Sequence, residues 1–120
     1  MEKTVYLSLL LDFYGELLTE KQREYADLYY NENLSLSEIA ENEGISRQSV
    51  RDALLRAEAA LRDTEEKTGL AARHQKLQQE IEGAEALLRQ IRALNAGSLR
   101  SPELLSLCTR LQQRLDEMKL

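Results

Sequence analysis

Apolar residues recur at helical spacing along almost the whole chain, and this pattern predicts an all-α protein. Residues 4–17 are apolar on most faces of a helix, so this helix should be buried on more than one side. Thr19 is suited to cap a second helix, with Glu20 in its first turn, where the helix dipole favours an anion. Residues 31–33 (NEN) should end that helix.

Two shorter helices that meet at a sharp corner are expected between residues 35 and 62. Ser35 and Glu38 have the spacing of a capping box, which begins a helix. Gly44 should end this helix in the left-handed conformation, and Ser46 should cap the next one. The spacing predicts a helix-turn-helix motif, with Ile45 re-entering the core at the corner. The expected inner positions are Leu36, Ile39, Ala40, Ile45, Val50, Leu54, Ala57 and Leu61.

The C-terminal half reads as one long helix over residues 65–94, a turn at 95–98 and a last helix that Ser101 caps. Apolar positions alternate at spacings of four and three in both helices, which is typical of a coiled-coil seam. The last helix can fold back along the long one as an antiparallel hairpin, and both seams could also serve a partner chain. The seam positions are Leu70, His74, Leu77, Ile81, Ala84, Leu88, Ile91 and Asn95, then Leu104, Cys108, Leu111, Leu115 and Met118.

Composition divides the chain near residue 63, because all five Tyr and the only Phe lie before it. We therefore expect a helix-turn-helix domain over residues 1–62. Residues 63–120 should form an appendage for dimerisation or packing. The longest near-apolar stretch, residues 5–11, is too short to cross a bilayer, which needs about 20 residues. No export signal is evident, so we expect a cytoplasmic protein without membrane insertion.

The chemistry needed for an enzyme or a metal site is sparse. A single Cys excludes an intramolecular disulfide and a Cys-based zinc cage, and no phosphate-cradling Gly loop is present. His74 with Glu80 or Glu85 could be imagined as a metal site, but packing is the favoured interpretation for a lone His at a seam position. Cys108 should be a small buried residue, and Tyr25, Tyr29 and Tyr30 should be core or interface residues. We expect no enzyme activity, cofactor or metal.

The start of the second helix of the motif carries the candidate DNA-binding residues. A helix-turn-helix inserts this part of its recognition helix into the major groove. Arg can form two hydrogen bonds to guanine, Gln can bind adenine in the same way, and Ser can hydrogen-bond a phosphate. The alternative is an ordinary solvated face, on which Arg51 pairs with Glu58 or Asp52. The candidate residues are Ser46, Arg47, Gln48, Ser49, Arg51, Asp52 and Arg56.

Charge limits what this motif can do. The chain of 120 residues has a formal charge of −5, which argues against a protein that coats nucleic acid indiscriminately. Residues 1–45 hold three cations and ten acids, residues 46–62 four cations and two acids, and residues 63–120 nine of each. The recognition helix is therefore a positive strip on an acidic body. DNA binding should be weak per subunit, and a homodimer could strengthen it by linking two half-sites.

Several short segments of the sequence resemble two known families. Residues 18–23 (LTEKQR), 36–40 (LSEIA) and 44–47 (GISR) resemble region 4 of bacterial sigma factors. The chain also resembles a smaller family, YlxM, at residues 12–22 (DFYGELLTEKQ), 28–30 (LYY), 34–41 (LSLSEIAE), 45–50 (ISRQSV) and 56–58 (RAE). The sigma resemblance implies that Arg47, Gln48, Arg51 and Asp52 face DNA.

The YlxM resemblance implies a small dimeric helical protein with a regulatory link to the signal recognition particle (SRP). The link is associational, because the family's genes accompany those for the particle's GTPase, Ffh, and its receptor. The leading hypothesis is a dimeric DNA-binding regulator. The alternative is an adaptor that has kept the fold but binds protein or RNA, such as Ffh or the SRP RNA.

Overall fold

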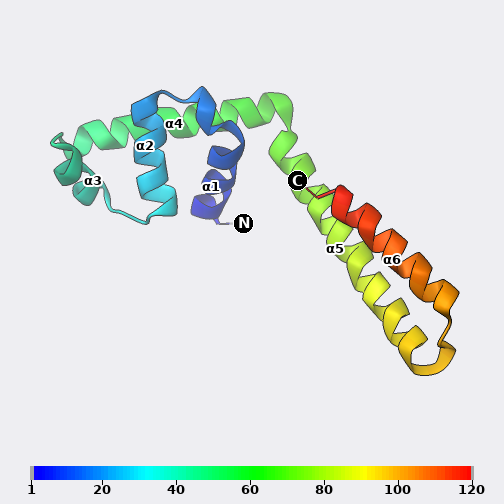
Figure 1. Cartoon of the computed structure of the whole chain (residues 1–120). Helices are drawn as coiled ribbons and strands as arrows, with labels where there is room; N and C mark the ends of the chain where they lie inside the picture. Colours follow the sequence, from blue (N-terminus) through cyan, green and yellow to red (C-terminus); the bar gives the residue numbers. More distant parts are fainter. Residues whose placement is uncertain (1, 120) are drawn as a thin grey trace. The chain divides into compact units, whose positions relative to one another are not determined.

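Residues 2–119 are described by a computed structural model, which contains helices and turns and no strand over that range (Figure 1). The chain divides into two compact units, Met1–Ala71 and Ala72–Leu120. The expected division between residues 62 and 63 falls inside a helix, and the boundary between the two units lies nine residues later. No helix within residues 2–119 has the length and apolar content needed to span a bilayer.

The N-terminal unit begins with α1 (Lys3–Tyr14), which buries Leu7, Leu10 and Leu11. A 3-10 turn over Gly15–Leu17 follows it, so α1 ends three residues earlier than expected. Helix α2 (Glu20–Ala26) begins at a capping box between Thr19 and Gln22, which confirms Thr19 as the predicted cap. It continues into a π-helical turn over Asp27–Asn31, which was not predicted.

The helix-turn-helix motif consists of α3 (Leu36–Glu43) and the first half of α4 (Arg47–Thr68). The Ser35–Glu38 capping box and the left-handed Gly44, with φ of 68°, are confirmed. Figure 1 shows α1, α2 and α3 on one side of α4, with α1 and α2 crossing its axis, and the core of the unit lies between these helices. The predicted inner positions Ile39, Ala40, Val50, Leu54, Ala57 and Leu61 are all buried.

Ile45 does not re-enter the core, and this expectation was wrong. Its side chain is 37% exposed. The backbone N–H of Ile45 donates to the Ala40 carbonyl at 3.1 Å, which ties the residue to the end of α3. Ile45 therefore lies in the corner between Gly44 and the Ser46 cap, at the surface of the motif.

The single long helix predicted over residues 65–94 was also wrong. Helix α4 runs to Thr68, Gly69 takes a left-handed conformation with φ of 64°, and α5 (Leu70–Leu94) begins at the next residue. The Gly69 N–H donates to the Glu65 carbonyl at 2.8 Å, as in a helix that ends at a left-handed glycine. The signal was present in the sequence, because Gly69 directly follows Lys67 and Thr68.

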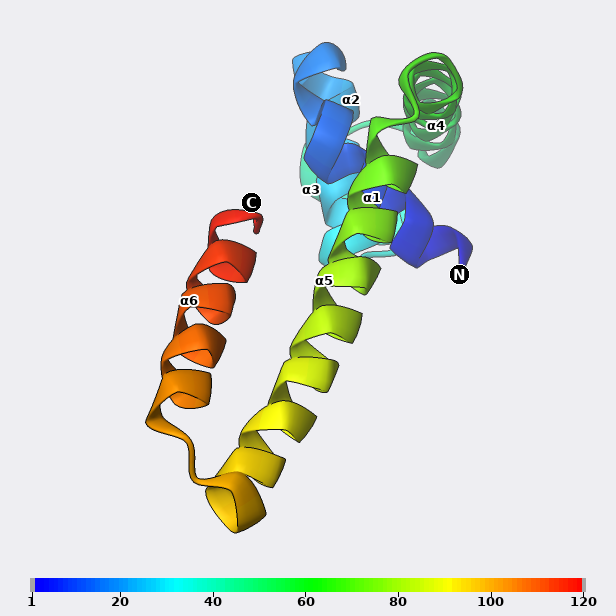
Figure 2. The same ribbon diagram turned by 90° about the vertical axis from the view of Figure 1, so that its right-hand side faces the viewer.

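The C-terminal unit is an antiparallel hairpin, as predicted. Helix α5 leads through a π-helical turn over Asn95–Leu99 into α6 (Pro102–Glu117), which Ser101 caps (Figure 2). The core of the hairpin consists of Ile81, Leu88, Cys108 and Leu115, with Leu77, Ala84 and Leu104 packed against it. Four other positions placed in the seams are exposed: Leu70, Ile91, Leu111 and Met118.

Candidate nucleic-acid interface

The first turn of α4 is held by the cap that the sequence predicts. Ser46 Oγ accepts a hydrogen bond of 3.0 Å from the Ser49 amide, and the two hydroxyl oxygens lie 2.8 Å apart. Both serines are exposed, but their hydroxyls already bond to each other. Their first role is therefore to fix the start of α4, and any ligand would compete with this pair.

The buried side of α4 determines which side chains face solvent. Val50, Leu54, Ala57 and Leu61 all pack into the core of the unit. Because successive residues are turned by about 100° around a helix, the opposite side is occupied by Gln48 and Asp52. Gln48 Nε2 donates to Asp52 Oδ1 at 3.0 Å. The centre of the outward face is thus an amide–carboxylate pair, which would have to open for Gln48 to bond an adenine bidentately.

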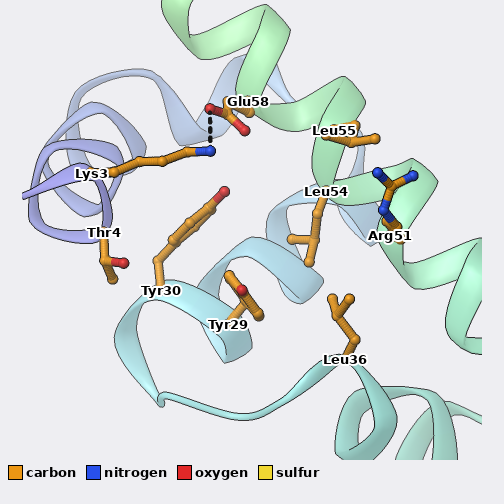
Figure 3. Close-up of a pocket in the computed structure, with 9 residues that line it drawn as sticks. All are labelled: Lys3, Thr4, Tyr29, Tyr30, Leu36, Arg51, Leu54, Leu55 and Glu58. Carbon is orange, nitrogen blue, oxygen red and sulfur yellow. Dashed lines mark ion pairs between the residues drawn. The ribbon is translucent and has the colours of Figure 1, made fainter.

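The arginines lie on the two flanks of this centre. Arg51 lies on one flank, where it borders a cavity together with Leu55 and the π-helical turn over Asp27–Asn31 (Figure 3). Its spacing places Arg47 one turn earlier on the same side. Arg56 lies on the other flank, where it borders a groove with Ser49. The outward face therefore presents cations along both edges and an acid in the middle.

Arg47, Arg51 and Arg56 are exposed, and none of them forms an ion pair with a residue in the range 2–119. The possible Arg51–Glu58 pair does not form. Glu58 instead pairs with Lys3 Nζ at 3.3 Å and with Arg62 Nε at 3.1 Å. Figure 3 shows the Lys3–Glu58 pair on the far side of the cavity from Arg51. The three arginines are thus available to an outside anion.

A cavity of about 220 Å³ lies beside Arg51, between α1, the π-helical turn over Asp27–Asn31, the start of α3 and α4 (Figure 3). Tyr29, Tyr30, Leu36 and Leu54 contribute its apolar and aromatic wall. Burial, reinforced by the nearby Glu58 carboxylate, raises the pKa of Tyr30 to about 12. Its hydroxyl is therefore neutral at physiological pH.

Lys21 is a cation near the interface that the sequence interpretation did not include. With Thr19 and Gln22 it borders the same groove as Ser49, Asp52 and Arg56, which has a volume of about 420 Å³. Lys21 Nζ lies 3.5 Å from Glu24 and 3.8 Å from Glu43, and the charge of Glu24 is the main cause that raises the Lys21 pKa. The signal in the sequence was a cation in the first turn of the helix that Thr19 caps.

The other residues that the sequence analysis singled out lie where packing accounts for them. Cys108 and Tyr25 are buried, as expected, and Tyr29 and Tyr30 are half-buried. Within residues 2–119, no three His, Cys, Asp or Glu side chains gather as metal ligands would. His74, Glu80 and Glu85 therefore do not assemble into a metal site with one another.

Comparison with known proteins places this motif in a family. The model of the UPF0122 family, described as "Putative helix-turn-helix protein, YlxM / p13 like", matches residues 1–95. The chain belongs to the UPF0122 family. This confirms the YlxM resemblance and extends it over α5.

Relatives in the UPF0122 family match beyond the end of the family model. A UPF0122 protein of Thermoanaerobacter sp. (strain X514) is 40% identical over 97% of this chain and 96% of its own length. A UPF0122 protein of Acetivibrio thermocellus is 43% identical over 98% of this chain and 97% of its own length. These matches include residues after 95, so the last helix has counterparts in both relatives.

Proposed function

We propose that this UPF0122 protein is a non-enzymatic helix-turn-helix regulator that binds DNA through the first half of α4. The observation that carries the proposal is the distribution of unpaired cations. Of the eight Lys and Arg in residues 2–71, Lys3, Lys21, Arg62 and Lys67 are in ion pairs. Three of the other four are Arg47, Arg51 and Arg56. The positive charge left over in an acidic unit is thus concentrated on the face that a helix-turn-helix presents to DNA.

The roles of the individual side chains follow from their positions. Arg47 and Arg51 on one flank and Arg56 on the other suit phosphates or guanines at the two edges of the major groove. Gln48 is the candidate for base contact, once it releases Asp52. Asp52 in the centre repels phosphate, and this limits non-specific binding. Ser46 and Ser49 hold the start of the helix.

Dimerisation would supply the affinity that one copy lacks, and the hairpin offers a surface for it. Glu85 Oε2 accepts hydrogen bonds from Gln112 at 2.8 Å and Lys119 at 2.9 Å, which joins α5 to α6 on one side. By helical spacing the exposed leucines and their neighbours lie on the other side of both helices. These side chains are Leu87, Ile91, Leu107, Leu111 and Met118. A second copy stacked on this face would form a four-helix bundle.

DNA binding is tested by fluorescence anisotropy on sites selected from genomic DNA with the purified protein. Arg47→Ala and Arg51→Glu should each weaken binding, and each lost phosphate contact should lower the salt slope by about one. Lys67→Ala is the matched control, because Lys67 is an exposed cation already paired with Asp63. Equal binding by the wild type and both arginine variants would overturn the proposal. Sedimentation equilibrium of Leu111→Glu, expected to be monomeric, tests the dimer.

A second candidate function is an adaptor in the SRP pathway, which the YlxM resemblance implies. Its support is the acidic groove of about 560 Å³ bordered by Asp12, Glu20, Glu24 and Asp27, with Arg23 the cation among them. Such a groove suits a basic protein surface and disfavours nucleic acid. The test is retention of the protein on immobilised Ffh, with and without SRP RNA. No retention at micromolar concentration would argue against this candidate.

A further inference from the structure

The loop that joins α5 to α6 has an uncharged tip with two protruding leucines. Residues 93–99 contain no Asp, Glu, Lys or Arg. Leu94 and Leu99 expose 62% and 60% of their surface. The loop forms the closed end of the hairpin in Figure 2. Exposed apolar side chains at such an end are suited to contact with something less polar than water.

The charge around this tip has one sign. Residues 86–102 contain Arg89, Arg92 and Arg100 and no acid, although the chain as a whole has a charge of −5. None of these arginines forms an ion pair within the part of the chain that the structure describes. The tip is therefore a cationic patch that attracts an anionic partner.

Arg100 occupies a backbone conformation that suits glycine or asparagine better. Its φ is 47°, in the left-handed region, where a Cβ is disfavoured. The Arg100 N–H donates to the Asn95 carbonyl at 2.6 Å and holds this conformation. Arg92 and Arg100 border the same apolar hollow of about 320 Å³, together with Pro102 and Leu105. An arginine kept in a strained position at the rim of an apolar surface points to a role for its side chain.

The polar groups of the loop bond to one another. Asn95 Oδ1 accepts from the Ser101 N–H at 2.7 Å, and Asn95 Nδ2 donates to the Ser101 carbonyl at 3.1 Å. Ser98 Oγ donates to the Leu94 carbonyl at 3.3 Å. A loop with internally paired polar groups can approach hydrocarbon without the penalty of unpaired ones. It offers few directional hydrogen bonds, which RNA or a specific protein would use.

We propose that this tip, residues 89–102, is a peripheral contact for an anionic lipid bilayer. Leu94 and Leu99 enter the boundary between headgroups and acyl chains, and Arg89, Arg92 and Arg100 bind the lipid phosphates. The contact lies on the membrane and does not span it, because the uninterrupted uncharged stretch, residues 93–99, is only seven residues long. Two leucines alone, or three cations alone, would attach the protein to a membrane only weakly. Because both act at the same tip they give measurable binding, which is still weak and reversible for one tip.

The test is cosedimentation of the full chain with phosphatidylcholine vesicles that contain either no phosphatidylglycerol or 30% of it. The wild type should pellet with the anionic vesicles and be released by 0.5 M NaCl. The double variant Arg92→Gln/Arg100→Gln should bind roughly 25-fold more weakly, at about fivefold for each cation. Leu94→Ser/Leu99→Ser keeps the charge and should lose at least tenfold, because neither side chain then buries apolar surface in the bilayer.

Arg110→Gln/Arg114→Gln is the matched control, because it removes the same charge from exposed positions of α6 outside the tip. It should bind as the wild type does, and circular dichroism checks that each variant folds. The proposal is overturned if the wild type does not pellet with anionic vesicles, or if the control loses as much as the tip variant. It is also overturned if the leucine variant binds normally, or if the tip arginines bind an added transfer RNA and not vesicles. It does not depend on DNA binding, since Arg47 and Arg51 lie outside the tip.

Discussion

The hydroxyl of Tyr14 donates a hydrogen bond of 2.6 Å to Glu65 Oε1, which joins the last residue of α1 to the last turns of α4. The same oxygen accepts the Ala71 N–H at 3.0 Å. Thr68 Oγ1 lies 2.6 Å from the Tyr14 oxygen, and because Tyr14 gives its proton to Glu65, Thr68 donates to Tyr14. A buried carboxylate is tolerated only when it is hydrogen-bonded, so this cluster supports the corner where α4 ends and α5 begins.

Replacing Tyr14 with Phe should destabilise the N-terminal unit by about 1–3 kcal/mol, because the buried Glu65 loses a donor while the ring remains. All five Tyr lie in residues 6–30, so tyrosine fluorescence during urea denaturation reports on this unit alone. Tyr6→Phe is the control, since its ring stacks on Arg62 while its hydroxyl makes no hydrogen bond within residues 2–119. Equal midpoints for the two variants would contradict the role given to the Tyr14–Glu65 bond.

Alanine should have opposite effects at Gly44 and Gly83. A Cβ added at either residue meets no atom within 4 Å, so backbone conformation alone decides the outcome. Gly44 has a φ of 68°, and Gly44→Ala should lower the free energy of unfolding by roughly 1–2 kcal/mol. Gly83 lies inside α5, and Gly83→Ala should raise it by roughly 1 kcal/mol. Thermal denaturation by circular dichroism should show shifts of opposite sign; shifts of the same sign would refute this explanation.

Asn95→Ala should loosen the hairpin and leave the helix-turn-helix unit intact. The buried Asn95 side chain makes both hydrogen bonds to Ser101, and their loss should destabilise the hairpin by about 1–3 kcal/mol. The helical signal in circular dichroism should then be lost at lower urea concentration, whereas the tyrosine fluorescence midpoint should not move. Amide hydrogen exchange at Ser101 should accelerate. Ser98→Ala, at an exposed position of the same loop, should have a much smaller effect.

Alkaline pH should destabilise the N-terminal unit through Tyr30. Its pKa of about 12 in the folded protein lies above the usual value near 10, so the unfolded chain ionises first. The stability that the neutral hydroxyl contributes is complete below pH 10 and is lost as the pH rises from about 10 to 12. Urea midpoints measured across this range should fall less steeply for Tyr30→Phe than for the wild type. Tyr6→Phe controls for the loss of one tyrosine hydroxyl, and parallel curves for all three proteins would rule out this origin.

The sequence could predict which residues form the candidate interface, but not which charged groups lie close to one another in it. The spacing of Ser46, Val50 and Leu54 was enough to place Arg47, Arg51 and Arg56 on the outside of one helix. It could not show whether Arg51 pairs with Glu58, because Lys3 and Arg62 compete for that carboxylate. Lys3 lies in α1, and Arg62 lies one turn after Glu58 in α4. Lys21 joined the interface for the same reason, since only the packing of α2 on α4 brings it near Arg56.

Local chemistry in the sequence by itself determined the helices, their caps and the helix-turn-helix motif. Ser35 with Glu38, left-handed Gly44, and Ser46 each act within a few residues, so their effects can be read along the chain. The tertiary structure decided the exposure of Ile45, the buried Tyr14–Glu65 bond and the choice of partners for the cations. These features join residues up to 55 positions apart, as Lys3 and Glu58 do, and chain spacing carries no information about such contacts.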